Sequence, residues 1–169
     1  MTPVALRDLY LAELNDLYDA EQQVLRELPL MAAGAASAEL RGAFDAHYRQ
    51  TQQHVARLEQ LFALLDERPR SVSCRALRGI IEDARLRNGH LERGDALDAS
   101  LIAEAQRMEH YEIAAYRSAH AFAMSLSDSE SAEVLQTTLE EERGMEQRMV
   151  QLSAVGGQMT AHRAPTHAH

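Results

Sequence analysis

Several residue types are absent or scarce in this chain, and each absence excludes a kind of chemistry. Its 169 residues include no lysine and no tryptophan, so all 17 basic side chains are arginine. Without lysine, a lysine nucleophile and a lysine Schiff base are excluded. The single cysteine, Cys74, excludes an internal disulfide framework and a cysteine-rich metal site. We interpret Cys74 as a small apolar side chain buried in the core.

Long apolar runs are also missing. No stretch of about 18 apolar residues occurs, so we expect no helix that crosses a membrane. The first residues, Met1 to Val4, lack the basic and then apolar order of a secretory signal, and we therefore expect a cytoplasmic protein. The formal charge of −9 repels phosphate backbones, which argues against a nucleic-acid partner.

The composition that remains is typical of one helical domain. Hydrophobic residues make up 46% of the chain and charged residues 25%, and apolar residues recur in steps of three and four. We predict an all-α protein with helices over about 3–33, 38–67, 73–88, 98–126 and 128–155. The first two and the last two form hairpins, and the shorter third helix is a crossover, which gives a four-helix bundle over residues 1–155. Gly156-Gly157 is expected to end the last helix, and residues 156–169 to form a disordered tail.

Carboxylates occupy inward positions in the middle of the predicted helices. The inner face of the fourth helix contains Glu109 and Glu112, one turn apart, between apolar residues. An ionised carboxylate taken out of water costs roughly several kcal/mol unless a partner compensates it. In the acidic run Glu140–Glu142 only Glu142 is expected to point inward. The polar residues on or bordering the inner faces of the other helices are Glu21, His47, Gln50, His54, Glu142 and Glu146.

Hairpin geometry brings these polar residues to one depth in the bundle. Glu21 lies level with Gln50 in the first hairpin, and Glu109 lies level with Glu146 in the second, each roughly 20–25 Å from its turn at about 1.5 Å per residue. No arginine occupies an inner face, so internal salt bridges are poorly supplied, and protonation would neutralise only one or two acids. Divalent ions resolve the charge, and hard oxygen ligands with imidazoles suit iron or manganese. The sequence therefore predicts a centre for two such ions.

Other interpretations of the same residues stay open. His47 and His54 could be core histidines that are hydrogen-bonded to a carboxylate or a backbone carbonyl. Glu141 would replace a neighbouring glutamate of the fifth helix if the helical register slipped by one residue. His110 and Tyr111 lie off the inner face, where packing or a hydrogen bond to a ligand is the commoner role. The histidines of the tail could bind metal adventitiously and support no function.

At these residues the chain resembles the YciE/YciF family of ferritin-like bacterial stress proteins. The similarity covers roughly residues 4–153 and is most specific at Glu109-His110-Tyr111-Glu112-Ile113. Further matching stretches are Leu17–Gln23, Leu28-Pro29, His47–Glu59, Cys74–Ala76, Leu101–Tyr116 and Thr138–Glu142. The resemblance implies a ferritin-like bundle similar to rubrerythrin, a carboxylate-rich centre that binds two metals, and a homodimer.

Two residues depart from the pattern of that family. Gln50 stands where the family usually has glutamate before Thr51, and a neutral amide oxygen is a weaker ligand for one of the metals. Glu146 stands where the family commonly has aspartate, so the charge is kept and the side chain reaches further.

Three functions are compatible with such a centre. The resemblance implies a ferroxidase, or another oxidoreductase that handles dioxygen or peroxide during oxidative stress. The alternative, motivated by Gln50, is a bundle without enzymatic activity that serves a structural or stress-response role and whose centre is vestigial or binds one metal for stability. A manganese centre that dismutates peroxide is the third.

Overall fold

The computed structural model describes residues 2–162, and within them the chain forms five helices and no strand. The helices are α1 (Pro3–Gly34), α2 (Ala38–Leu64), α3 (Arg75–Asn88), α4 (Asp95–Ser125) and α5 (Ser129–His162). None of the helices in this range combines the length and the apolar character needed to cross a membrane. The predicted all-α class is confirmed.

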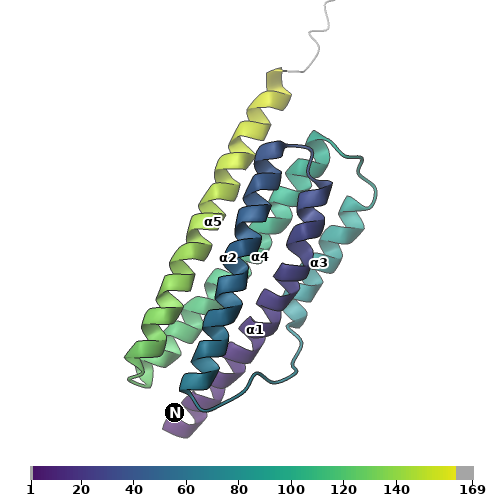
Figure 1. Ribbon diagram of the computed structural model, residues 1–169. Coiled ribbons are helices and arrows are strands. Elements are labelled where there is room, and N and C mark those ends of the chain that lie inside the picture. Colours follow the sequence, from purple (N-terminus) through teal and green to yellow (C-terminus); the bar gives the residue numbers. More distant parts are fainter. Residues whose placement is uncertain (1, 163–169) are drawn as a thin grey trace, which may run out of the picture.

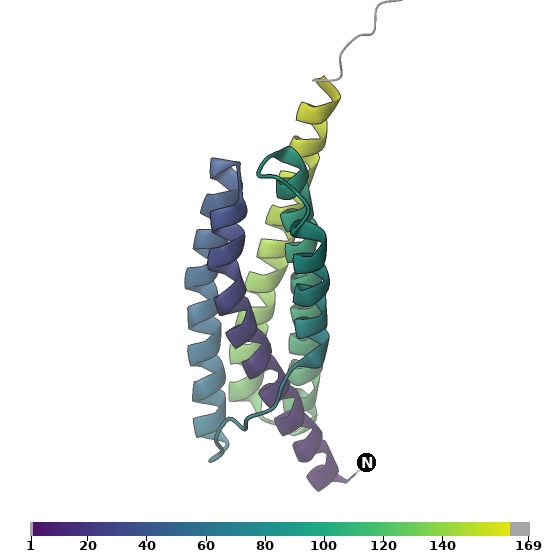
Figure 2. The same cartoon turned by 90° about the vertical axis from the view of Figure 1, so that its right-hand side faces the viewer.

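The helices form two antiparallel hairpins joined by a crossover helix (Figures 1 and 2). The first hairpin is α1 with α2 and the second is α4 with α5; the two pack together through α1 against α4 and α2 against α5. Helix α3 carries the chain from one end of the bundle to the other and packs against α4 and α1 (Figure 1). The predicted four-helix bundle with a shorter crossover is therefore confirmed.

Two apolar clusters fill the bundle on either side of a polar layer. One cluster includes Val24, Phe44 and Met108, and the other includes Leu17 and Leu58, all of them buried. On α4 the first cluster ends at Met108 and the second begins at Ile113, so Glu109 and Glu112 fall between them. The apolar clusters thus exclude water from both ends of the layer that holds the polar residues.

Helices α2 and α4 both end earlier than the periodicity indicates, and both ends have the same cause. After α2, Asp66 adopts a φ of 54°, and the backbone N–H of Glu67 donates to the carbonyl of Phe62 at 2.9 Å. After α4, Ser127 adopts a φ of 61°, and the N–H of Asp128 donates to the carbonyl of Ala123 at 3.0 Å. This pattern closes a helix with a left-handed residue that is usually glycine, and here glycine is absent.

The predicted bounds of the other helices also need correction. Helix α4 begins at Asp95 rather than Asp98, and the Asp98 carboxylate accepts from the backbone N–H groups of Ala36 and Ser37 in the α1–α2 turn. The prediction that Gly156-Gly157 ends the last helix is wrong, because α5 continues to His162. Each glycine costs a helix about 1 kcal/mol relative to alanine but does not block it. The rest of the predicted tail, 163–169, lies outside the described residues.

Replacing Ser127 with glycine is expected to stabilise the protein by about 0.5–1 kcal/mol, because a left-handed conformation costs a residue with a Cβ atom about 1–2 kcal/mol. Ser127 is exposed, so no packing is lost. Thermal unfolding would measure the gain as an increase in Tm. The matched control is Ser125→Gly at the last helical residue of α4, which should lower the Tm. A Tm of Ser127→Gly at or below that of the unaltered chain would contradict this explanation of the helix end.

Candidate metal centre

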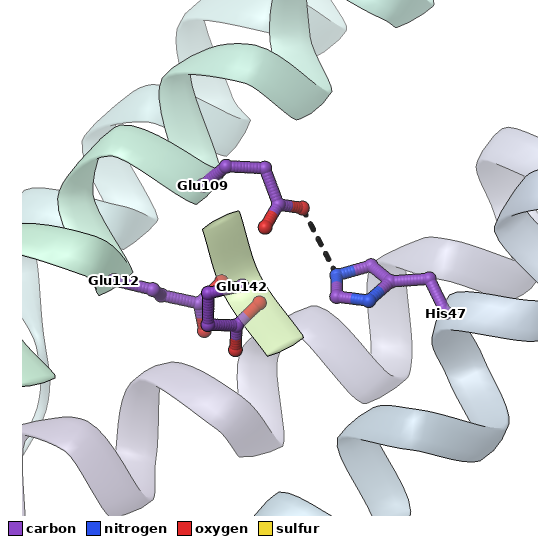
Figure 3. A group of neighbouring side chains, drawn as sticks. All are labelled: His47, Glu109, Glu112 and Glu142. Atoms are coloured by element: carbon purple, nitrogen blue, oxygen red, sulfur yellow. Dashed lines mark ion pairs between the residues drawn. The ribbon is translucent and has the colours of Figure 1, made fainter. Parts of the chain in front are cut away.

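Four buried side chains from three helices converge in the polar layer (Figure 3). His47 comes from α2, Glu109 and Glu112 come from α4, and Glu142 comes from α5; one ligand atom of each lies within 4.8 Å of the others. Nε2 of His47 is 3.0 Å from Oε1 of Glu109. We refer to these four residues as the His47 group. It contains the two glutamates whose burial the periodicity of α4 predicts.

A second set of ligand atoms lies beside the first and shares Glu142 with it. Nδ1 of His54 is 3.3 Å from Oε1 of Glu21 and 2.9 Å from Oε1 of Glu142. We refer to Glu21, His54 and Glu142 as the His54 group, whose ligand atoms also lie within 4.8 Å of one another. Because Glu142 belongs to both groups, it would be a ligand of both cations if each group held one.

The residues of both groups are buried, and most of their polar atoms have no hydrogen-bond partner. None of the six side chains belongs to a residue with more than 1% of its surface exposed. Among the described residues, no hydrogen bond reaches either oxygen of Glu109, Glu112 or Glu142. The same holds for both ring nitrogens of His47 and for Nδ1 of His54. Buried polar atoms are rarely left unpaired in folded proteins, so this set of oxygen and nitrogen donors fits a metal ion.

Burial and mutual repulsion shift the pKa values of the acids in the direction expected for an uncompensated charge cluster. Burial raises the pKa of Glu109 and that of Glu142, and the negative charge of Glu21 raises both further. The pKa of Glu112 is raised well above its usual value by burial and then by Glu21. Protons therefore occupy ligand positions when no cation is bound, and a cation must displace them.

The two histidines respond in opposite directions to the same environment. Burial lowers the pKa of His47, and this effect outweighs the nearby carboxylates. Burial also lowers the pKa of His54, but Glu21 and Glu142 raise it more strongly, to about 11. His54 therefore supplies positive charge to the acids of its group, in addition to being a candidate ligand.

Residues outside the two groups hold some of the candidate ligands in place. Tyr116 donates a hydrogen bond to Oε1 of Glu21 at 2.5 Å. Oε2 of Glu141 is 2.9 Å from Nε2 of His54, and Arg57 donates to both Glu141 oxygens. Glu142 is the one fully buried acid of the run Glu140–Glu142, as expected, and Glu141 reaches His54 from the border with 27% of its side chain exposed. The expectation that arginine forms no salt bridge in this layer needs correction, because Arg57 reaches Glu141 from the border of α2.

Glu146 belongs to neither group, and Gln50 lies at the edge of the inner face of α2. Gln50 is partly buried beside His47, and the inner face of α2 presents the fully buried Thr51 instead. This follows from the spacing of His47, Thr51 and His54 in steps of four and three, which turns Gln50 to the border. Glu146 is partly exposed, and its carboxylate lies 3.9 Å from the exposed His110 ring.

Two further buried acids, not anticipated from the sequence, lie away from the centre against the crossover helix. Glu27 of α1 pairs with Arg85 of α3, and Glu104 of α4 accepts from Asn88 at 3.0 Å. Burial, and then Glu27, raise the pKa of Glu104 to about 7. Because both acids have partners on α3, they attach the crossover helix to the bundle.

Cys74 is fully buried, as predicted.

The fold and the centre together define the class of this protein. Its helices superpose on a Bacillus anthracis protein described as ferritin-like and diiron-carboxylate, with a TM-score of 0.69 at 17% identity over 90% of this chain and 99% of the other. At that identity the likeness concerns the fold. The chain is thus a ferritin-like bundle with buried histidines and glutamates between two apolar clusters.

The chain belongs to the family described as Domain of unknown function (DUF892), which matches residues 5–162. It is 32% identical to the protein YciF of Escherichia coli K12 over 154 residues, which cover 90% of this chain and 93% of YciF. The crystal structure of YciF, described as a stress protein, matches with a TM-score of 0.85 and covers 90% of this chain and 97% of that one. The resemblance to the YciE/YciF family is therefore confirmed.

A second solved relative carries a different description. The Rhodopseudomonas palustris protein YcfI, described as a candidate structural protein, matches with a TM-score of 0.83 at 36% identity, over 88% of this chain and 93% of that one.

Proposed function

We propose that this protein binds two divalent iron or manganese ions between α1, α2, α4 and α5, and that it oxidises Fe(II) with dioxygen or peroxide. The observation that supports the proposal most strongly is the pair of buried ligand groups that share Glu142 and in which most donor atoms lack hydrogen-bond partners among the described residues. The His47 group would hold one ion and the His54 group the other.

The charge of the proposed ligands matches two divalent cations. The four carboxylates Glu21, Glu109, Glu112 and Glu142 carry four negative charges when ionised, and the two imidazoles are neutral when they act as ligands. Two divalent cations balance that charge, which removes the cost of burying the carboxylates. Carboxylate oxygens with imidazole nitrogens are donors that suit iron and manganese. Gln50 and Glu146 border this set and are not part of the proposed ligands.

The proposed reaction transfers one electron from each of two Fe(II) ions to the oxidant. Dioxygen that accepts two electrons and two protons becomes hydrogen peroxide, and peroxide that accepts two electrons and two protons becomes two molecules of water. The protein places the ions next to each other, and the apolar clusters on either side keep bulk water away from them. We further propose that the protein acts as a homodimer in the cytoplasm, and light scattering after size-exclusion chromatography would measure its mass.

Fe(II) oxidation in air tests the proposal. The unaltered protein is expected to form Fe(III) faster than buffer does. In the double variant Glu109→Ala with Glu112→Ala, that rate should fall by more than about tenfold. Replacing a residue that only supports a metal ligand already lowers metal affinity or activity by about 10–100-fold. The matched control replaces the exposed Glu133 and Glu140 with alanine and should keep the rate. An unchanged rate in the Glu109 and Glu112 variant would reject the ferroxidase.

A second function is favoured by the composition of the His54 group. That group has three ligand residues. Helix α2 contributes no carboxylate to it, because Gln50 and Thr51 occupy the positions one turn before His54. A centre that binds one ion for stability would follow, in a bundle that serves a structural role. Metal would then raise the Tm through preferential binding to the folded state, while turnover with dioxygen or peroxide stayed at background. Release of dioxygen from hydrogen peroxide would instead indicate a manganese centre that dismutates peroxide.

A further inference from the structure

Arg57 and Glu141 form a hydrogen-bonded link from the border of the α2–α5 interface to the buried ring of His54. Arg57 donates to both oxygens of the Glu141 carboxylate, at 2.5 Å to Oε2 and 3.0 Å to Oε1. Arg57 also donates to the hydroxyl of Thr138 at 3.2 Å, one turn before Glu141 on α5. Two parallel bonds from one guanidinium fix the orientation of a carboxylate as well as its position. The Glu141 oxygens are therefore held in one arrangement.

That arrangement determines which nitrogen of His54 faces the centre. Oε2 of Glu141 lies 2.9 Å from Nε2, and this carboxylate, paired with Arg57, accepts a hydrogen bond from Nε2–H, whereas Nδ1 points at the carboxylates of Glu21 and Glu142. A neutral imidazole donates through one nitrogen and binds a metal through the other. No hydrogen bond occupies Nδ1 among the residues that the structure describes. With Nε2–H engaged by Glu141, Nδ1 is left as the ligand atom.

We propose that Arg57 and Glu141 are positioning residues that keep Nδ1 of His54 turned toward Glu21 and Glu142, and that they set the affinity of the His54 group alone. This inference rests on the proposed two-metal function. Within the described range, Arg57 and Glu141 make their hydrogen bonds with Thr138, His54 and each other, and none with His47, Glu109 or Glu112. The His47 group is therefore expected to keep its affinity when the link is removed.

The competing explanation is an ordinary salt bridge between two helices. Arg57 and Glu141 are partly exposed, with side-chain exposures of 23% and 27%, and ion pairs at such positions contribute little to stability. If stability were their only role, removing either residue would lower the Tm of the metal-free protein. It would then weaken both metal sites together, in proportion to the lost stability. The two explanations differ in whether one site or both respond.

Calorimetric titration with Mn(II) separates these explanations. The unaltered protein is expected to bind two ions, and Glu141→Ala should weaken one of them by about 10–100-fold while the affinity for the other is unchanged. Glu141→Gln should lose less, because its amide oxygen still accepts from Nε2–H. Arg57→Ala should lie between the two, because Glu141 remains but is no longer fixed. The matched control is Glu140→Ala, whose side chain is exposed and bonds only Gln136 in the described residues.

Three results would overturn the positioning role. Glu141→Ala could bind both ions as the unaltered protein does, or both affinities could fall together with the Tm of the metal-free protein. An unaltered protein that binds a single ion would overturn this inference and the two-metal proposal together. Two bound ions with separated affinities, but Fe(II) oxidation at background, would support the positioning role and reject the ferroxidase alone.

Discussion

Replacing both Glu109 and Glu112 with glutamine is expected to stabilise the metal-free protein by about 1–4 kcal/mol at pH 8, because it removes buried negative charge, and replacing buried charges with uncharged residues of similar volume gains about this much where it stabilises. Neither carboxylate accepts a hydrogen bond of good geometry among the described residues, and the one close partner, Nε2 of His47 at 3.0 Å from Oε1 of Glu109, can still donate to the amide oxygen of glutamine. At this chain length 1 kcal/mol corresponds to about 2–4 °C in Tm. Chemical denaturation of protein treated with a chelator would measure the change in the free energy of unfolding.

The stabilisation by this double variant should depend on pH. Burial raises the pKa of Glu109 and of Glu142 from 4.5 to about 8, and that of Glu112 further, so the folded protein holds protons that the unfolded chain has released. Stability from such groups is fully present below pH 4.5 and is lost as the pH rises through the raised values. The raised pKa of His54 acts in the same direction above pH 6.5, whereas the lowered pKa of His47 opposes it only below that value.

The metal-free protein should therefore lose stability between about pH 5 and pH 8, and the glutamine variant should lose less. At pH 5 the two proteins should be nearly equal, because the glutamates are already protonated there. The control with Glu133 and Glu140 changed to glutamine should stay within about 0.5 kcal/mol of the unaltered protein, as is usual for exposed positions. A glutamine variant that is less stable at pH 8 would show that the two carboxylates have partners that stabilise the metal-free fold.

Mn(II) at about one hundred times its dissociation constant is expected to add about 2.7 kcal/mol to the free energy of unfolding for each bound ion. This corresponds to an increase in Tm of about 5–10 °C. At a fixed Mn(II) concentration, set to this multiple of the dissociation constant at pH 8, the increase should be smaller at pH 6, because the cation must displace protons from ligands whose pKa values are raised. Calorimetric unfolding with and without Mn(II) at both pH values would measure it.

The glutamine variant is also the control for the effect of Mn(II), because it should lose the part of the increase in Tm that comes from an ion in the His47 group and keep only the part from the His54 group. The chain has a net charge of −9, and its exposed acids could attract Mn(II) without a defined site. An equal increase in the unaltered protein and in the variant would mean that surface binding explains the stabilisation. The two opposite effects of one substitution, a gain in stability without metal and the loss of part of the stabilisation by metal, follow only from a buried metal site.

Helical periodicity was sufficient to predict the burial of the central acids. Glu109, Glu112 and Glu142 each stand in an inner-face pattern of apolar residues at steps of three and four, and all three are fully buried. The same pattern assigns Thr51 to the inner face of α2 and turns Gln50 to its border. The match to the YciE/YciF family drew attention to Gln50, although the spacing between His47 and His54 already favoured Thr51.

The residues that support His54 could not be predicted by periodicity. Arg57 lies three residues after His54, at the border of the buried face, and it reaches Glu141 through a long side chain. Periodicity assigns directions to Cβ atoms, whereas the contact depends on how far the side-chain atoms beyond Cβ extend and on how α2 and α5 are rotated against each other. Arginine was therefore missing from the predicted layer although one serves it.

Helix ends were predicted less well than helix centres. Asp66 and Ser127 end α2 and α4 in a left-handed conformation that glycine normally signals, and neither is glycine. Conversely, the pair Gly156-Gly157 predicts a helix end, yet α5 continues through it to His162. In both cases the residue type limits which backbone conformations are favourable, but contacts with the rest of the bundle determine where the helix ends.

Anomalous diffraction from crystals grown with Mn(II) tests the central claim most directly. Two peaks inside the bundle are expected, one between His47, Glu109 and Glu112 and the other between Glu21 and His54, with the carboxylate of Glu142 next to both. Peaks confined to acids on the surface, or no peak in the layer between the two apolar clusters, would contradict it.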